Sequence, residues 1–454
     1  MRIVIVGAGM VGYSLAEYFS GLNHYITIIE KDKELCENIN NKLDVFVVEG
    51  SGSSPAVLDE ADIKSADLVI AVTPSDEINL LVCNFAMQNG VKKRIARVKS
   101  NIYTENTPNV SLEKLGVTSL IEPELEVMKR VLQYVELPDV IETANFQAND
   151  VYLRGYRVTK DMPIAHKTLA QIRRMAEDSP MLFVVIVRTG RSLPPTGDQK
   201  LLPGDKFVAI MPKESFKTFC TLINRKISKM KKIVVSGDTL TAIHLAEALK
   251  PLCEQVILTD PDLEHGRIAA SMLHGVEVFH LDSTKSDMLE EMNIKHVDCF
   301  IAAGKYPEDN VMSCLLAKVE GAGMAIALRD DKRYDTLFTS LGMDHIIYPQ
   351  EITLNAIIEK IQMGSLGTHL QLKTADIEVM RAKAGKDSPV TGKSLQQLDK
   401  FFKKSIIVGC IIQGNSVIIP RGDTVIQEND EVMVLTPKKN INLVNKAFDL
   451  GNGA

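Results

Sequence analysis

The sequence predicts an α/β protein in which a doubly wound parallel sheet, followed by a small α+β domain, occurs twice along the chain. Three observations lead to this prediction. Short β-branched runs alternate with amphipathic stretches, a glycine-rich turn follows the first run, and the chain matches itself at an offset of about 230 residues. The length of 454 residues is compatible with about two to four domains, and the repeat favours four.

The first sheet is predicted from five short runs that are rich in Val and Ile. Such runs are typical of parallel strands that are buried on both faces. The expected strands are Ile3–Val6, Ile26–Glu30, Val45–Val48, Leu68–Val72 and Ile95–Val98. Amphipathic stretches separate them, beginning with a helix from about Met10 to Phe19. This βαβ alternation predicts a Rossmann-like sheet.

The second half of the chain repeats the first. Arg2–Glu30 aligns with Lys232–Asp260, and Asp67–Ala86 aligns with Asp298–Ala317. The segment from Asp44 also resembles the one around Glu277. Within these alignments Glu77 falls on Glu308, Asn79 on Asn310 and Cys83 on Cys314. The same order of elements is therefore expected in both halves.

Each half ends in a shorter part with more alternating, strand-like segments, near Asn149–Pro212 and Asp376–Pro437. These parts also match, with Gly197-Asp198 on Gly422-Asp423 and Asp205 on Asp430. The predicted domains are 1–140 and 231–362 for the parallel sheets, and 141–225 and 366–450 for the smaller domains.

Composition excludes several classes of protein. The 52 basic and 58 acidic side chains give a net charge of −6, which argues against a nucleic-acid partner. Seven scattered cysteines and nine histidines show no metal spacing, and the odd cysteine count argues against a disulfide framework. The start lacks a secretory signal, and the apolar runs are too short to span a bilayer, so a cytosolic protein is expected.

One basic stretch, Ser215–Lys232, joins the two halves and contains no acidic residue. Two interpretations are compatible with it: a solvated linker with cations near a helix C-terminus, or a surface that binds anionic lipid.

The strongest functional motif is the glycine-rich turn Gly7–Gly12, in which Gly7, Gly9 and Gly12 enclose Ala8, Met10 and Val11. The first glycine permits the tight turn, the second lets a pyrophosphate approach the backbone, and the third lets helix and strand pack closely. Glu30 closes the second strand, at the position from which an acid binds ribose hydroxyls.

The identity of the nucleotide stays open at this point. The carboxylate of Glu30 would repel a 2′-phosphate, so NAD(H) is favoured over NADP, but ATP and ADP present the same adenosine ribose. Lys31 and Asp32 follow Glu30 and are candidate binding residues. An aspartate in a loop is more often a turn or cap residue, so Asp32 has that interpretation as well.

Further candidates lie where later strands end, because ligands of open α/β sheets collect at that edge. Gly50 and Ser51 follow the third strand, as binding or plain turn residues. Thr73 and Glu77, with Asp76 and Asn79, follow the fourth, as binding or helix-capping residues. Arg97 ends the fifth strand, where its cation either faces phosphates or forms a surface ion pair.

The second glycine motif is degraded. It keeps Gly237, but Thr239 and Ala242 replace the second and third glycines. The Thr239 side chain would crowd a pyrophosphate, whereas Asp260 retains the ribose acid. A mononucleotide or a differently posed ligand therefore stays possible, with Gly237 and Asp260 as its candidate residues.

These motifs resemble one family over nearly the whole chain: TrkA, the peripheral nucleotide-binding subunits of Trk-type potassium uptake systems, with tandem KTN/RCK domains each followed by a TrkA-C domain. The resemblance rests on the duplicated order, on the motif at Gly7–Gly12 with Glu30, and on the segments from Gly50, Ala71 and Ala96. It implies a homodimer or tetramer on the cytoplasmic face of a TrkH-like membrane translocator, responding to NAD(H) or ATP/ADP.

Two other functions are weighed against this one. A dehydrogenase would need an acid or base beside the nicotinamide. Tyr156 and Lys160 match the Y-x-x-x-K pattern of short-chain dehydrogenases, but they lie in a strand-like segment, and His166 suits a surface position. A scaffold with empty sites is the other alternative, against which the intact first motif argues. No catalytic residue is predicted.

Overall fold

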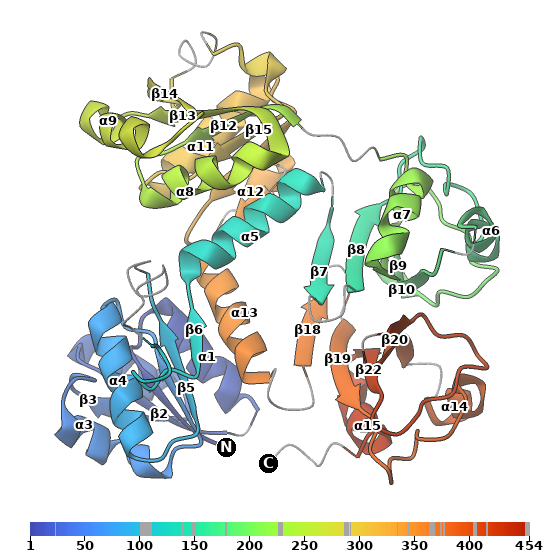
Figure 1. Cartoon of the computed structure of the whole chain (residues 1–454), viewed down its shortest axis with the longest axis horizontal. Helices are drawn as coiled ribbons and strands as arrows, with labels where there is room; N and C mark the ends of the chain where they lie inside the picture. The colour runs from blue at the N-terminus through green and yellow to red at the C-terminus, as the bar shows by residue number, and fades with distance from the viewer. Residues whose placement is uncertain are drawn as a thin grey trace. The chain divides into compact units, whose positions relative to one another are not determined.

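The computed structural model describes residues 1–22, 24–99, 111–137, 140–146, 151–177, 179–225, 230–285, 290, 292–333, 335–343, 345–362, 368–372, 375, 377–402, 406–414 and 416–449. These residues form two units (Figure 1): the first combines 1–132 with 230–360, and the second combines 133–229 with 361–453. The first unit holds both parallel sheets, and the second holds both smaller domains.

The first sheet is parallel and has the strand order β3-β2-β1-β4-β5-β6. This order is that of a Rossmann sheet. Its topological switch point, where the strand order reverses, lies between β1 and β4. The strands are β1 (Arg2–Val6), β2 (Tyr25–Glu30), β3 (Phe46–Glu49), β4 (Leu68–Ala71), β5 (Lys93–Arg97) and β6 (Ser119–Ile121). Its helices are α1 (Met10–Ser20), α2 (Lys33–Lys42), α3 (Pro55–Glu60), α4 (Asp76–Gln88) and α5 (Pro123–Glu136).

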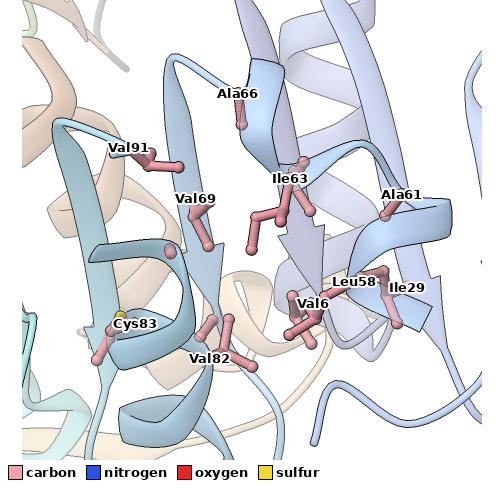
Figure 2. Packing of buried hydrophobic residues seen from close by; sticks show 14 of the residues in the cluster. Val6, Ile29, Leu58, Ala61, Ile63, Ala66, Val69, Val82, Cys83 and Val91 are labelled. Atoms are coloured by element: carbon pink, nitrogen blue, oxygen red, sulfur yellow. The ribbon is translucent and has the colours of Figure 1, made fainter. Parts of the chain in front are cut away.

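The core of this sheet explains why its strands are apolar on both faces. Val4 and Val6 pack on one face with residues of α3 and α4, whereas Ile3 and Ile5 are buried on the other. Figure 2 shows Leu58 of α3 beside Val6 and Ile29 of the sheet, with Val69 of β4 and Val82 of α4 in the same cluster. The five predicted strands are confirmed to within two residues, and β6 is an additional strand.

The second parallel sheet has the matching order β14-β13-β12-β15-β16-β17. Its strands are β12 (Met230–Ser236), β13 (Cys253–Asp260), β14 (Glu277–His280), β15 (Cys299–Ala302), β16 (Met324–Leu328) and β17 (His345–Ile347). Its helices are α8 (Leu240–Leu249), α9 (Leu263–Met272), α11 (Pro307–Val319), α12 (Asp335–Ser340) and α13 (Pro349–Gln362). The predicted duplication of the sheet is confirmed strand by strand.

The second unit contains two five-stranded antiparallel sheets, with orders β10-β9-β11-β8-β7 and β18-β19-β22-β20-β21. The first comprises β7 (Glu142–Phe146), β8 (Val151–Arg157), β9 (Leu182–Arg188), β10 (Arg191–Leu193) and β11 (Lys206–Pro212), with α6 (Leu169–Met175) and α7 (Phe216–Leu222). The other comprises β18 (Thr368–Leu372), β19 (Ile377–Lys383), β20 (Ile407–Gln413), β21 (Ser416–Ile418) and β22 (Glu431–Pro437), with α14 (Leu395–Phe402) and α15 (Ile441–Ala447).

The two antiparallel sheets share one apolar core. Val185 and Ile210 of the first sheet and Cys410 and Met433 of the second belong to the same buried cluster. A Cβ added to Gly409 would lie 2.6 Å from the Ile210 Cδ1 atom, so the sheets approach closely at this point. Burial raises the pKa of the Cys410 thiol to about 12. The predicted α+β domains are thus confirmed, and they are packed face to face.

The basic stretch Ser215–Lys232 is only partly a linker. Lys217 lies in α7, whereas Lys231 and Lys232 belong to β12. The Lys232 Nζ donates to the Met292 carbonyl at 2.9 Å. Residues 226–229, like the predicted limits Asn149 and Asp376, lie outside the described residues, and the exact domain boundaries and lipid binding stay predictions.

All seven cysteines are buried free thiols. Across the described ranges, no helix has both the length and the apolar character needed to cross a bilayer.

Candidate functional site

The glycine turn between β1 and α1 has the backbone that the motif requires. Gly7 has a φ of +99°, and a Cβ there would lie 3.0 Å from the Thr73 backbone nitrogen. A Cβ on Gly12 would lie 1.9 Å from the Gly7 carbonyl oxygen, so α1 packs directly on the turn. The predicted roles of Gly7 and Gly12 are confirmed.

The N-terminus of α1 is open. Gly9 is its N-cap residue and supplies no side-chain hydrogen bond, and a Cβ there would meet no atom within 4 Å. Met10, the first residue of the helix, is exposed, whereas Val11 is buried against the fold. A helix that begins without a side-chain cap leaves N–H groups available for an anion. The turn therefore has the form of a phosphate cradle, and its occupancy stays a prediction.

Glu30 lies beside this cradle, at the end of β2. Its Oε2 accepts a 2.6 Å hydrogen bond from the Ala8 N–H, inside the glycine turn. Its Oε1 accepts from the N–H groups of Lys31 at 2.8 Å and Asp32 at 3.0 Å. These bonds fix the carboxylate at the carboxyl edge of the sheet and leave one lone pair, on Oε2, for a ribose hydroxyl.

Asp32 has a structural role in α2. It is the N-cap residue, and its Oδ1 accepts hydrogen bonds from Glu34 and Leu35 at 2.9 and 3.1 Å. The capping interpretation is therefore confirmed for Asp32. Lys31 is exposed, and its contribution to binding stays a prediction.

The segment after β3 forms a tight turn close to Glu30. The Gly50 N–H donates to the Glu30 carbonyl at 2.8 Å, and the Ser51 and Ser53 hydroxyls are 2.8 Å apart. A Cβ on Gly52 would lie 2.4 Å from Val6, so this turn lies against β1. The turn interpretation is confirmed, and Gly50 and Ser51 stay candidates for contact with an adenosine.

Half-buried Thr73 and buried Asn79 form a hydrogen-bonded pair after β4. The Asn79 Oδ1 accepts from the Thr73 N–H at 2.9 Å and from the Thr73 hydroxyl at 2.7 Å. The Asn79 Nδ2 donates to the carbonyls of Thr73 at 3.0 Å and Arg97 at 2.8 Å. Asn79 therefore does not cap a helix; it joins the ends of β4 and β5.

The cap of α4 is Ser75, which sequence reasoning did not single out. Its hydroxyl accepts from the Ile78 N–H at 3.2 Å and donates to the Glu77 carboxylate at 2.7 Å. The hydrogen bond from Ser75 lowers the pKa of exposed Glu77. Asp76 accepts from the Lys99 N–H at 3.0 Å and so fixes the segment after β5. The Pro-Ser-Asp-Glu order at a helix start is the signal that identifies Ser75 as the cap.

Arg97 ends β5 at the same edge of the sheet. Its Nε is buried and has no hydrogen-bond partner among the described residues. Burial lowers the pKa of the Arg97 guanidinium, and the charge of Asp76 opposes that shift. A buried donor of this kind is unusual in a folded protein, and a phosphate oxygen is one group that would satisfy it. A ligand role for Arg97 stays a prediction.

The corresponding edge of the second parallel sheet is closed by its own side chains. Thr239 caps α8: its hydroxyl accepts from the Ala242 N–H at 3.1 Å and donates to the Ala303 carbonyl at 2.6 Å. Asp260 is fully buried and is bonded to His265 and to the Asp262 N–H. Gly237 keeps a close approach, since a Cβ there would lie 2.6 Å from the Gly304 nitrogen. Nucleotide contacts from Gly237 and Asp260 stay predictions.

The residues that suggested other chemistry lie elsewhere. Tyr156 is in strand β8, is 2% exposed, and packs against Phe207 and Phe219, so the Y-x-x-x-K match is not helical. Within the part of the chain that the structure describes, no group of three or more His, Cys, Asp or Glu side chains could hold a metal ion.

Comparison with known proteins agrees with this architecture. The model of the TrkA-N domain matches residues 3–123 and 233–349, and that of the TrkA-C domain matches residues 153–224 and 379–449. The Trk system potassium uptake protein TrkA of Azorhizobium caulinodans is 28% identical over 454 residues, covering 99% of this chain and 98% of that protein. The protein of the same name from Haemophilus influenzae is 29% identical over 455 residues, with coverage of 99% and 98%.

Solved structures share the fold. The GsuK channel bound to NAD is 16% identical with a TM-score of 0.62, covering 99% of this chain and 79% of that one. The GsuK RCK domain is also 16% identical, with a TM-score of 0.60 and coverage of 99% and 95%. The family models together span most of the sequence in the predicted tandem order. This chain therefore belongs to the family of proteins built from TrkA-N and TrkA-C domains.

Proposed function

We propose that this chain is the nucleotide-sensing regulatory subunit of a Trk-type potassium uptake system, and that the nucleotide binds at the first parallel sheet. The observation that carries the proposal is the open N-terminus of α1 beside the carboxylate of Glu30. The names of the full-length relatives support the link to potassium uptake. The structure of a GsuK channel with bound NAD supports a dinucleotide as the ligand.

The proposed ligand is NAD(H), with ATP or ADP as the alternative at the same site. All three share an adenosine ribose for Glu30 and a diphosphate for Gly7–Gly12. Gly50, Ser51, Thr73, Glu77 and Arg97 surround the same edge and are the further proposed contacts. Lys31 and Asp32 adjoin the ribose position.

In this proposal the nucleotide is a signal and not a reactant. The chain acts at the cytoplasmic face of the membrane, as a homodimer or tetramer attached to a TrkH-like translocating subunit. Binding at Gly7–Gly12 shifts the population of arrangements that the translocator senses, which requires that the nucleotide bind the two arrangements with different affinity.

Calorimetric titration of the purified full-length protein with NAD, NADH, ATP and ADP tests the binding step. We expect saturable binding by the wild type and much weaker binding by Glu30→Gln. Absence of binding by all four nucleotides would overturn the proposal, and steady turnover of NADH with a small substrate would favour a dehydrogenase instead. Potassium flux into vesicles that hold the translocating subunit, with and without this chain and nucleotide, tests the regulatory step.

A further inference from the structure

We propose that Asn79 is a positioning residue for nucleotide binding, acting through the backbone of Thr73 and the placement of Arg97. The proposal rests on the proposed function, because it concerns the same site. Asn79 itself has no access to a ligand, since its side chain is 0% exposed. Its effect on binding must therefore pass through the two loop ends that it holds.

The hydrogen-bonding capacity of the Asn79 amide is fully used. Oδ1 accepts two bonds from Thr73, and Nδ2 donates one bond to each of the carbonyls of Thr73 and Arg97. A carboxamide offers two donors and one oxygen with two lone pairs, so no capacity remains. If the Asn79 amide were flipped, its Nδ2 would face the Thr73 N–H and two donors would oppose each other. The hydrogen bonds therefore determine the orientation of the amide.

The bond to Thr73 reaches the phosphate cradle. The Thr73 backbone forms the wall behind Gly7, where the gap is so small that a Cβ on Gly7 would lie 3.0 Å from the Thr73 nitrogen. A displacement of Thr73 therefore moves the wall of the turn on which a diphosphate would lie. The buried Asn79 amide holds this wall through its hydrogen bonds to Thr73.

The bond to Arg97 reaches the cationic side of the site. Nδ2 holds the carbonyl of Arg97 at 2.8 Å, at the last residue of β5. The position of this backbone determines where the guanidinium lies, and its Nε is the buried donor that has no partner among the described residues. One buried amide thus sets two of the loop ends around the ligand position.

The second sheet contains the same amide without the groups that it would position. Asn310 accepts from the Gly304 N–H at 2.8 Å, and donates to the carbonyls of Gly304 and Leu328, both at 3.0 Å. Gly304 stands where the first sheet has Thr73, and Leu328 stands where it has Arg97. The structural clamp is therefore present in both halves, but a threonine and an arginine occupy the clamped positions only in the first. In the second, the residue after Leu328 is the cation Arg329, which is buried and bonded to Asp331 at 3.1 Å.

This pairing supplies a matched control. The full-length variants Asn79→Ala and Asn310→Ala each remove one buried clamp, so both are expected to lower the melting temperature by a similar amount. Only Asn79→Ala is expected to weaken NAD or ATP binding, by about tenfold or more, whereas Asn310→Ala changes the dissociation constant by less than about twofold. Calorimetry and thermal melting on the same samples measure both effects.

A double-mutant cycle separates positioning from general loosening of the fold. Arg97→Ala is expected to weaken binding, and adding Asn79→Ala to it is expected to cost much less affinity than Asn79→Ala costs in the wild type. If Asn79→Ala does not fold, Asn79→Ser with Asn310→Ser replaces that pair, because a serine fills part of the space and its hydroxyl is small and uncharged.

Equal affinity losses in the two halves, or full additivity with Arg97→Ala, would overturn the positioning role. Failure of the proposed function is distinguishable from this result, because the unmodified protein would then bind none of the four nucleotides.

Discussion

The two parallel sheets of the first unit have the same strand order and the same buried asparagine, yet their carboxyl edges differ. In the first, Gly9 leaves α1 without a side-chain cap, and Glu30 faces the glycine turn. In the second, Thr239 caps α8, and Asp260 is bonded to His265. Contacts that hold the fold are retained in both sheets, whereas the groups suited to a ligand are retained in one.

The largest effect is expected from Gly12→Ala. A Cβ at this position would lie 1.9 Å from the Gly7 carbonyl oxygen, so helix and turn must separate, at an expected loss of about 3 kcal/mol of stability or more. The second half has an alanine, Ala242, at the position that corresponds to Gly12. Ala242→Gly is the control, with an expected loss of about 1 kcal/mol from helix propensity. Thermal melting measures both, and an unchanged melting temperature for Gly12→Ala would contradict the close packing.

Glu30 and Asp260 are the carboxylates at the predicted ribose position of the two sheets, and replacing each of them compares the two sites directly. Glu30→Gln is expected to weaken nucleotide binding by about 100-fold, because it removes the charge from the hydrogen bond to the ribose and replaces one acceptor oxygen by an amide group. Asp260→Asn is the matched variant. A second equivalent of nucleotide in the wild-type titration that disappears in Asp260→Asn would show that the second half binds as well, and would end the contrast between them.

Giving α1 the N-cap residue that α8 has, a threonine in place of Gly9, is expected to raise stability and lower nucleotide affinity. Gly9→Thr places a side chain in open space, so the fold should tolerate it, and a new N-cap adds about 0.5 kcal/mol. The same side chain occupies the place of a phosphate, so affinity should fall by about tenfold. Calorimetry and melting of the one variant measure both. Unchanged affinity would mean that the diphosphate does not lie over Gly9.

The smallest expected effect concerns the antiparallel domains. Arg188 donates two 2.8 Å hydrogen bonds to Asp205, which is 2% exposed, whereas Gln413 supplies one 3.0 Å bond to Asp430 in the second copy. Burial by itself raises the pKa of Asp205, but hydrogen bonds from Arg188 and the Leu202 N–H lower it overall. Arg188→Gln, which copies the arrangement at Gln413, should remove about 1 kcal/mol at neutral pH.

The pH dependence follows from the sign of that shift. Because the folded-state pKa of Asp205 lies below its unfolded value, its contribution is present above the unfolded pKa and is lost as pH falls through the folded pKa. Melting curves of wild type and Arg188→Gln should therefore converge at strongly acidic pH. A difference that stays constant from neutral to strongly acidic pH would exclude this ion pair as its cause.

Most of the parallel sheets could be predicted from sequence because their strands are buried on both faces. Runs such as Ile3–Val6 have no polar alternation, and the repeat doubles the signal. The strand Ser119–Ile121 was missed because three residues with a polar start carry no clear pattern. The glycine turn could be predicted because its steric demands allow only glycine at Gly7 and Gly12.

The hydrogen-bonded side of the site could not be predicted. Asn79 and Arg97 are 18 residues apart, and only the pairing of β4 with β5 brings the amide to that carbonyl. Likewise, the residues of the second motif suggest a weakened site, but they do not show that Thr239 would bond the Ala303 carbonyl 64 residues away. Local patterns indicate turns and caps, whereas contacts between loops depend on the assembled sheet.

The shared core of the two antiparallel sheets has a consequence for how the halves relate. A half-length chain would expose the apolar face around Ile210, and a second half-length copy would be needed to cover it. Covalent linkage replaces that bimolecular encounter by a local concentration in the millimolar range, on the order expected for tethered modules. It also favours the pairing of two unlike halves, so that an open carboxyl edge and a closed one occur in the same molecule.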